Sequence, residues 1–149
     1  MRLKPWQDAI MDRLRDQLND DIPIEDGGYG EGADEVVSKL ENGMLQPYVL
    51  VWFGGSVDAG IGHETIGGVN QASRLSMVHF ECVGPTGTMA RDLGDEVRAA
   101  LVGFVPANEG ELQEDGQPTI RNPISTTTGL DVRYAYPLTF KGFVNATTP

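Results

Sequence analysis

The sequence lacks three features that mark exported and membrane proteins. It has one cysteine, Cys82, so it excludes an internal disulfide and a multi-cysteine zinc site, and the single thiol fits a reducing cytosol. No apolar segment approaches the roughly 18 residues that span a bilayer. The N-terminal stretch "MRLKPWQDAIMDRL" has no apolar run followed by a small-residue cleavage site, so we expect no signal peptide.

Basic residues are also scarce. Eleven Lys and Arg stand against 22 Asp and Glu, which gives a net charge of −11 at pH 7. Binding to nucleic-acid phosphates needs clustered Lys and Arg, and no run of them forms a patch. The composition therefore argues against an ordinary nucleic-acid binder, and it disfavours attraction to an anionic membrane surface.

The residues that are present predict one folded domain, residues 1–149. Hydrophobic residues make up 40% of the chain, which suits a modest core. Residues 5–18 have apolar side chains every four positions, which predicts an amphipathic helix. Thr86 or Thr88 is predicted to cap a second helix that runs to about Phe104. The predicted core stripes are Trp6, Ile10, Leu14 and Leu18 in the first helix, and Leu93, Val97, Ala100, Leu101 and Phe104 in the second.

Three segments have the patterns of β-strands. Residues 46–55 contain six consecutive apolar residues, many aromatic or β-branched, which predicts a strand buried on both faces. Residues 74–83 alternate, so Val78, Phe80 and Cys82 are predicted to face the core. Residues 131–144 also alternate, and Pro137 places this strand at a sheet edge or a bulge.

The order of these elements favours an α+β fold. We predict a mixed, mainly antiparallel sheet of about four to five strands, with two amphipathic helices packed on one face. Long loops are expected at residues 19–35, 54–73 and 105–130. The first is acidic and rich in glycine, lacks the ligand pattern of a calcium loop, and contains a short "IPI" that suits an edge strand. The last is expected to be extended and mobile.

The stretch "VGPTGTMAR" joins the second strand to the second helix and invites comparison with a phosphate-binding loop. Such a loop needs a Lys followed by Ser or Thr, and its backbone N–H groups contact the phosphate. There is no Lys here, and Pro85 removes one N–H donor. We therefore interpret the stretch as a turn and a helix cap.

The candidates for chemistry are few. His79 and Glu81 are predicted to share the face opposite the core, and weak metal binding there is the alternative to a polar sheet face. His63 and Glu64 form a similar pair without a third ligand nearby. Cys82 lies on the opposite face from His79, so a buried structural cysteine is predicted. We predict no catalytic, cofactor-binding or metal site, and a protein that is not an enzyme.

Four stretches, in this order along nearly the whole chain, carry a resemblance to a known family. They are "WQDAIMDRLRDQL", "PYVLVWFGG", "LSMVHFECVGPTGTMARDLGDEVRAAL" and "VRYAYPLTF". The third is the most specific. Together they resemble the tail terminator proteins of long-tailed (siphovirus-type) bacteriophages, of the type found in phages of actinobacteria.

The resemblance implies a structural protein of the virion neck that is assembled in the host cytoplasm. Such proteins form a homohexameric ring that caps the tail tube, ends its polymerisation and provides a surface for head–tail joining. The implied partners are further copies of the chain, the major tail tube protein and a head-side connector or completion protein. DNA is expected to pass through the lumen without specific binding, and no cofactor is implied. Loops 54–73 and 105–130 are hypothesised to make the assembly contacts.

Other interpretations stay open. Another neck component, such as a head–tail connector or head-completion protein, is the nearest alternative. A small metal-dependent hydrolase would use His63, Glu64, His79 and Glu81. A host-cell adaptor domain that binds peptides along a sheet edge is the third.

Overall fold

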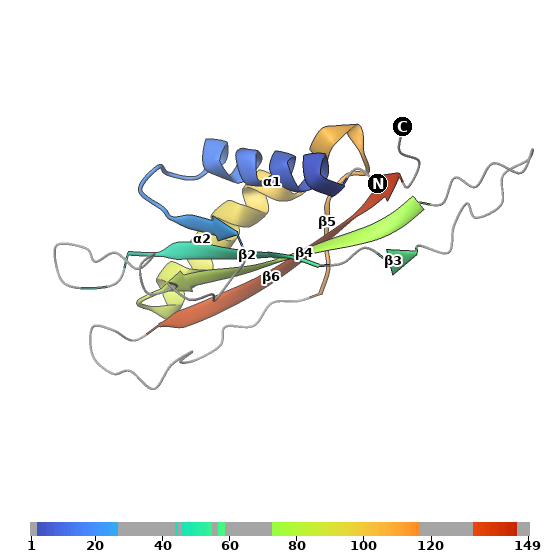
Figure 1. Cartoon of the computed structure of the whole chain (residues 1–149). Helices are drawn as coiled ribbons and strands as arrows, with labels where there is room; N and C mark the ends of the chain where they lie inside the picture. Colours follow the sequence, from blue (N-terminus) through green and yellow to red (C-terminus); the bar gives the residue numbers. More distant parts are fainter. Residues whose placement is uncertain are drawn as a thin grey trace, which may run out of the picture.

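The computed structural model describes residues 3–26, 44, 46–54, 57–58, 73–116 and 133–145. Within these ranges it contains two α-helices, a short 3₁₀ turn and six strands (Figure 1). The helical elements are α1 (Leu3–Gln17), α2 (Gly87–Leu101) and η2 (Pro106–Asn108). The strands are β1 (Ile24–Asp26), β2 (Tyr48–Phe53), β3 (Val57–Asp58), β4 (Ser73–Gly84), β5 (Gln113–Glu114) and β6 (Tyr134–Asn145).

The strands form a mixed, mostly antiparallel sheet in the order β1-β2-β4-β6-β5, with β3 also paired to β4. Its centre is the long antiparallel pair of β4 and β6, which lie side by side from Ser73–Asn145 to Gly84–Tyr134 (Figure 1). The β1–β2 pair is parallel, and the other pairs are antiparallel. The arrangement confirms the predicted α+β class. Neither helix in the described part of the chain has the length and apolar content to cross a bilayer.

The main core lies between the helices and one face of the sheet. Val78, Phe80 and Cys82 point into it from β4, each at most 1% exposed, as their alternation predicted. Phe80 packs edge-on against Phe140 of β6, with ring centroids 5.8 Å apart. The four residues of the predicted first-helix stripe, Trp6, Ile10 and Leu14 of α1 and Leu18 just after it, are all buried in the same core.

A second apolar cluster lies on the opposite face of the sheet. It consists of Tyr48, Leu50, Val83 and Ala135, with Trp52 partly buried beside them. Because Val49 and Val51 belong to the main core, β2 is buried on both faces along Tyr48–Val51. This confirms the interpretation of its uninterrupted apolar run.

Arg13 of α1 contacts the C-terminal end of α2 and the residues that follow it. Its Nε donates a hydrogen bond to the carbonyl oxygen of Ala100 at 3.0 Å, and its guanidinium lies 5.2 Å from the centre of the Phe104 ring. Helix α2 ends at Leu101, three residues earlier than predicted, because Val102 is already extended (φ −62°, ψ 123°) and Gly103 follows it with a φ of 79°. Glycine tolerates this left-handed conformation, so it ends the helix at little cost.

The expectation of an extended segment at 105–130 does not hold for residues 105–116. Leu112 is only 1% exposed, and β5 pairs with Lys141 and Phe140 of β6. The Leu112 N–H donates to the carbonyl oxygen of Phe104 at 2.8 Å. One buried leucine in a polar stretch produces no periodicity, so the burial of Leu112 could not be predicted from the sequence pattern.

The other two predicted loops are described only in part. Residues 24–26 form β1, an edge strand close to the predicted one, while 27–35 lie outside the described residues. In the range 54–73, the structure describes Gly54, β3 and the first residue of β4. Pro137 lies at a position of β6 where no described strand pairs on the side away from β4, which agrees with its predicted place at a sheet edge.

Candidate functional site

The turn between β4 and α2 contains the stretch that invited comparison with a phosphate loop. The Oγ1 of Thr86 accepts a hydrogen bond from the N–H of Met89 at 3.1 Å, so Thr86 is the cap of α2. A Cβ on Gly84 would lie 2.9 Å from the backbone nitrogen of Ala90, so only glycine fits the close approach of strand and helix. Gly84 and Thr86 thus serve the turn and the cap.

Arg98 is the centre of a polar network that joins α2 to the sheet. Its Nε and Nη2 donate to the two carboxylate oxygens of Glu114 at 2.8 and 3.0 Å, which is a bidentate ion pair. Its Nη1 donates to Asp95 at 2.7 Å, and Nη2 also donates to the hydroxyl of Tyr136 at 3.0 Å. The hydrogen bond to Glu114 raises the pKa of Arg98 further above its ordinary value. Sequence reasoning missed this network because its members come from α2, β5 and β6.

The predicted pair shares one face of β4, but this face also carries the second apolar cluster and is not wholly polar. His79 and Glu81 lie on the face opposite the main core, His79 between Trp52 and Thr139, and Glu81 between Leu50 and Pro137. The Nδ1 of His79 is 2.9 Å from the Oγ1 of Thr139. Within the described ranges, no three His, Cys, Asp or Glu side chains gather closely enough to hold a metal ion.

The second predicted pair, His63 and Glu64, lies outside the described residues. The structure therefore brings together His79 and Glu81 but does not place them relative to His63 and Glu64.

Cys82 is fully buried in the main core, which confirms the predicted burial. Burial raises its pKa above the ordinary range of a thiol, because the thiolate would lose its hydration. The thiol and His79 project to opposite faces of β4, so this histidine is not positioned to act as its base.

We expect Cys82 to react with iodoacetamide at pH 8 at least about a hundredfold more slowly in the folded protein than in urea, because labelling requires the core to open. Mass spectrometry of the labelled fraction over time measures both rates. Similar rates in the two conditions would show that the thiol is accessible and reactive in the folded state.

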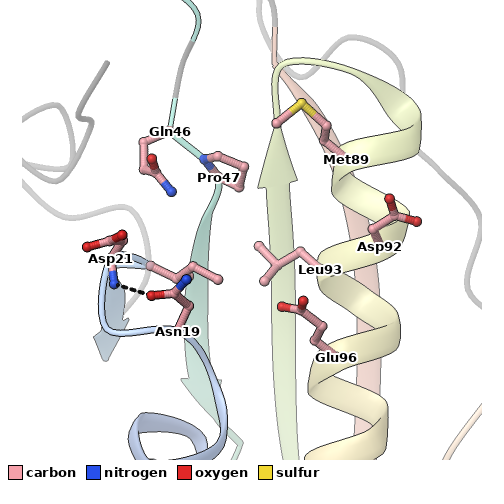
Figure 2. Close-up of a pocket in the computed structure, with 9 residues that line it drawn as sticks. Asn19, Asp21, Gln46, Pro47, Met89, Asp92, Leu93 and Glu96 are labelled. Carbon is pink, nitrogen blue, oxygen red and sulfur yellow. Dashed lines mark hydrogen bonds between the residues drawn. The ribbon is translucent and has the colours of Figure 1, made fainter. Parts of the chain in front are cut away.

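A groove opens on the outer surface of the main core, and we call it the acidic groove (Figure 2). Its volume is about 300 Å³, and it lies between the α1–β1 connection, the start of β2 and the first half of α2. It is lined by Asn19, Asp21, Ile22, Gln46, Pro47, Met89, Asp92, Leu93 and Glu96. No sequence pattern pointed to it, because its residues come from three separate segments.

The acidic groove has an apolar floor and a charged rim. Leu93, which is 4% exposed, belongs to the main core, and Ile22 packs against that core from the other side. Figure 2 shows Leu93 and Glu96 reaching from α2 toward the opposite wall, with Asp21 and Asp92 at the outer rim. All three carboxylate residues are exposed, and none of the lining residues that the structure describes is basic.

Three large apolar side chains are exposed: Val102 and Val105 follow the end of α2, whereas Phe143 lies on β6 and alternates with the core residues Phe140 and Val144, so it projects from the opposite face of the sheet. Val102 is 55% exposed, Val105 48% and Phe143 44%. The N–H of Gly110 donates to the carbonyl oxygen of Phe143 at 2.8 Å, so the connection that carries the two valines continues along β6. Exposed apolar side chains of this size are candidates for contacts with another protein surface.

No model of a known protein family matches the chain. Comparison with curated protein sequences finds no match either. What the protein does is therefore inferred from its residues and their arrangement.

Proposed function

We propose that the protein is a structural virion protein that forms a ring on the tail tube of a long-tailed bacteriophage. The ring ends tube polymerisation and provides the surface for head–tail joining. One observation carries the proposal: the four stretches on which the resemblance rests form α1, β2, the β4–α2 unit and β6, and they pack around one core. The residues of the most specific stretch serve the turn, the helix cap and the packing, as a structural subunit requires.

A closed ring of identical subunits needs two different surfaces on each subunit that fit one another. The exposed Val102 and Val105, which follow the end of α2, are well suited to one of them, because their burial between copies would remove apolar area from water. Of the two loops hypothesised to make these contacts, 105–130 includes Val105, and most of 54–73 lies outside the described residues. The net charge of −11 suits a lumen that DNA crosses without sticking.

Electron microscopy tests the proposal on the purified protein and on tubes assembled from the major tail protein of the same phage. We expect rings seated at one end of the tubes, and tubes that stop growing once the protein is added. Val105→Asp places a charge in the proposed contact and is expected to reduce ring formation, whereas Asp12→Asn on the exposed face of α1 is not.

Two outcomes would contradict the proposed function. A protein that stays monomeric in the presence of tubes and leaves their growth unchanged is not a terminator; if it binds capsids instead, it is a connector or head-completion protein. Stoichiometric zinc or manganese, together with hydrolysis that is lost in His79→Ala, would favour the metal-dependent hydrolase.

A further inference from the structure

The acidic groove combines a small apolar surface with negative charge, and this combination favours a ligand that is both apolar and positively charged. We propose that it binds a Lys or Arg side chain that a partner protein presents beside an apolar residue. The inference rests on the groove alone and goes beyond the ring proposed above, since it concerns neither self-assembly nor the tube.

The floor can accept apolar atoms. Leu93 and Ile22 form the outer surface of the main core, and Pro47 and Met89 extend it toward the start of β2. A volume of about 300 Å³ is at the small end of the range for ligand pockets, so it suits one or two side chains rather than a large cofactor. The methylene stem of Lys or Arg packs well on such a surface while its charged end stays at the rim.

The rim supplies the charge. Glu96 reaches from α2 toward the groove, while Asp21 and Asp92 lie at its two outer edges with their carboxylates turned outward (Figure 2). A guanidinium group can donate two parallel hydrogen bonds to a carboxylate, and an ammonium group can donate to several oxygens. The chain has 22 acidic and 11 basic residues, so its net negative charge attracts a basic segment of a partner and repels an acidic one.

The opposite wall is fixed before the partner arrives. The Oδ1 of Asn19 accepts a hydrogen bond from the N–H of Asp21 at 3.1 Å, which holds the α1–β1 connection in a turn (Figure 2). Ile22, the next residue, packs against the main core. The groove is therefore largely formed in the free protein, which lowers the entropic cost of binding.

Other ligand classes fit less well. Among the residues that the structure describes, the rim carboxylates do not form a group of three that could hold a metal ion. Among the described lining residues, anions such as phosphate would meet three carboxylate side chains and no basic one. A purely apolar side chain would remove water from the rim carboxylates without donating a hydrogen bond to them.

A peptide titration followed by methyl and amide NMR tests the proposal on the full chain. The probes are two capped pentapeptides, Gly-Leu-Arg-Leu-Gly and its counterpart with Glu in place of Arg. We expect saturable shifts at Ile22, Met89 and Leu93 with the Arg peptide, and none with the Glu peptide. In Glu96→Gln the Kd of the Arg peptide is expected to rise about tenfold, or about 1.4 kcal/mol.

Glu111→Gln is the matched control, because Glu111 is an exposed carboxylate in the connection beyond the other end of α2. The proposal is overturned if both peptides bind alike, if the control variant weakens binding as much as Glu96→Gln, or if the shifts lie outside the groove. Shifts at the groove that depend on protein concentration alone would identify a second copy of the chain as the occupant, which also overturns it. None of these measurements involves rings or tubes, so the two proposals can fail separately.

Discussion

Replacing Leu112 with alanine is expected to lower the free energy of unfolding by about 2–5 kcal/mol, the usual cost of emptying a buried leucine site. Leu112 is 1% exposed, and one of its methyl carbons lies against the backbone of β6 at Gly142. Its N–H and C=O bond to Phe104 and Gly103, so the surrounding backbone has little freedom to fill the cavity. Denaturation by urea, followed by tryptophan fluorescence, measures the change.

Val105→Ala is the control for this prediction. Val105 belongs to the same connection but is 48% exposed, so its truncation is expected to change the free energy of unfolding by less than about 0.5 kcal/mol. If Leu112→Ala were equally neutral, the connection after α2 would contribute little to the core. The comparison of Leu112 with Val105 is informative because residues 105–116 have no sequence pattern that predicts which of the two side chains is buried.

Gly94→Ala is expected to destabilise the protein by about 2 kcal/mol, although alanine is the better helix former by about 1 kcal/mol. A Cβ at position 94 would lie 2.1 Å from Cδ1 of Tyr136, well inside van der Waals contact. Tyr136 is packed under α2, and its hydroxyl accepts a hydrogen bond from Arg98, so the ring cannot turn away without breaking that bond. Either α2 moves off the sheet or the Arg98 network is lost. Thermal and urea unfolding measure the effect.

A double-mutant cycle separates the steric clash from other effects of the alanine. In a Tyr136→Ala background the ring is gone, and Gly94→Ala is expected to be neutral or slightly stabilising. The coupling between the two positions should then exceed about 2 kcal/mol, as is seen only for side chains in direct contact. Equal costs of Gly94→Ala in both backgrounds would show that the approach of α2 to Tyr136 does not limit this position.

Much of the fold was predictable because its elements are strongly periodic. The four-residue spacing of Trp6, Ile10, Leu14 and Leu18 and the alternation of Val78, Phe80 and Cys82 report which faces are buried, and both are confirmed. Element ends were less well placed. Helix α2 stops at Leu101 rather than near Phe104, since the turn made by the extended Val102 and the left-handed Gly103 outweighs the apolar spacing that continues to Phe104.

Features of the candidate site were predictable only where the residues involved are close together in the sequence. Thr86 was one of two predicted caps, because a cap acts on backbone groups within its own turn. The shared face of His79 and Glu81 followed from strand geometry. Arg98 and Glu114 are 16 residues apart, and the acidic groove joins residues of three segments, so no local pattern marks them.

By itself, the sequence determined the elements and their buried faces, because side-chain periodicity follows directly from backbone geometry. It also determined the charge and the absence of disulfides. Only the tertiary structure decided which distant segments supply the burial: the parallel pairing of β1 with β2, the place of Leu112 in the core, and the contact of Gly94 with Tyr136. These contacts depend on how the surfaces of distant segments fit together. The periodicity of one segment shows which of its faces is buried, but not which other segment covers that face.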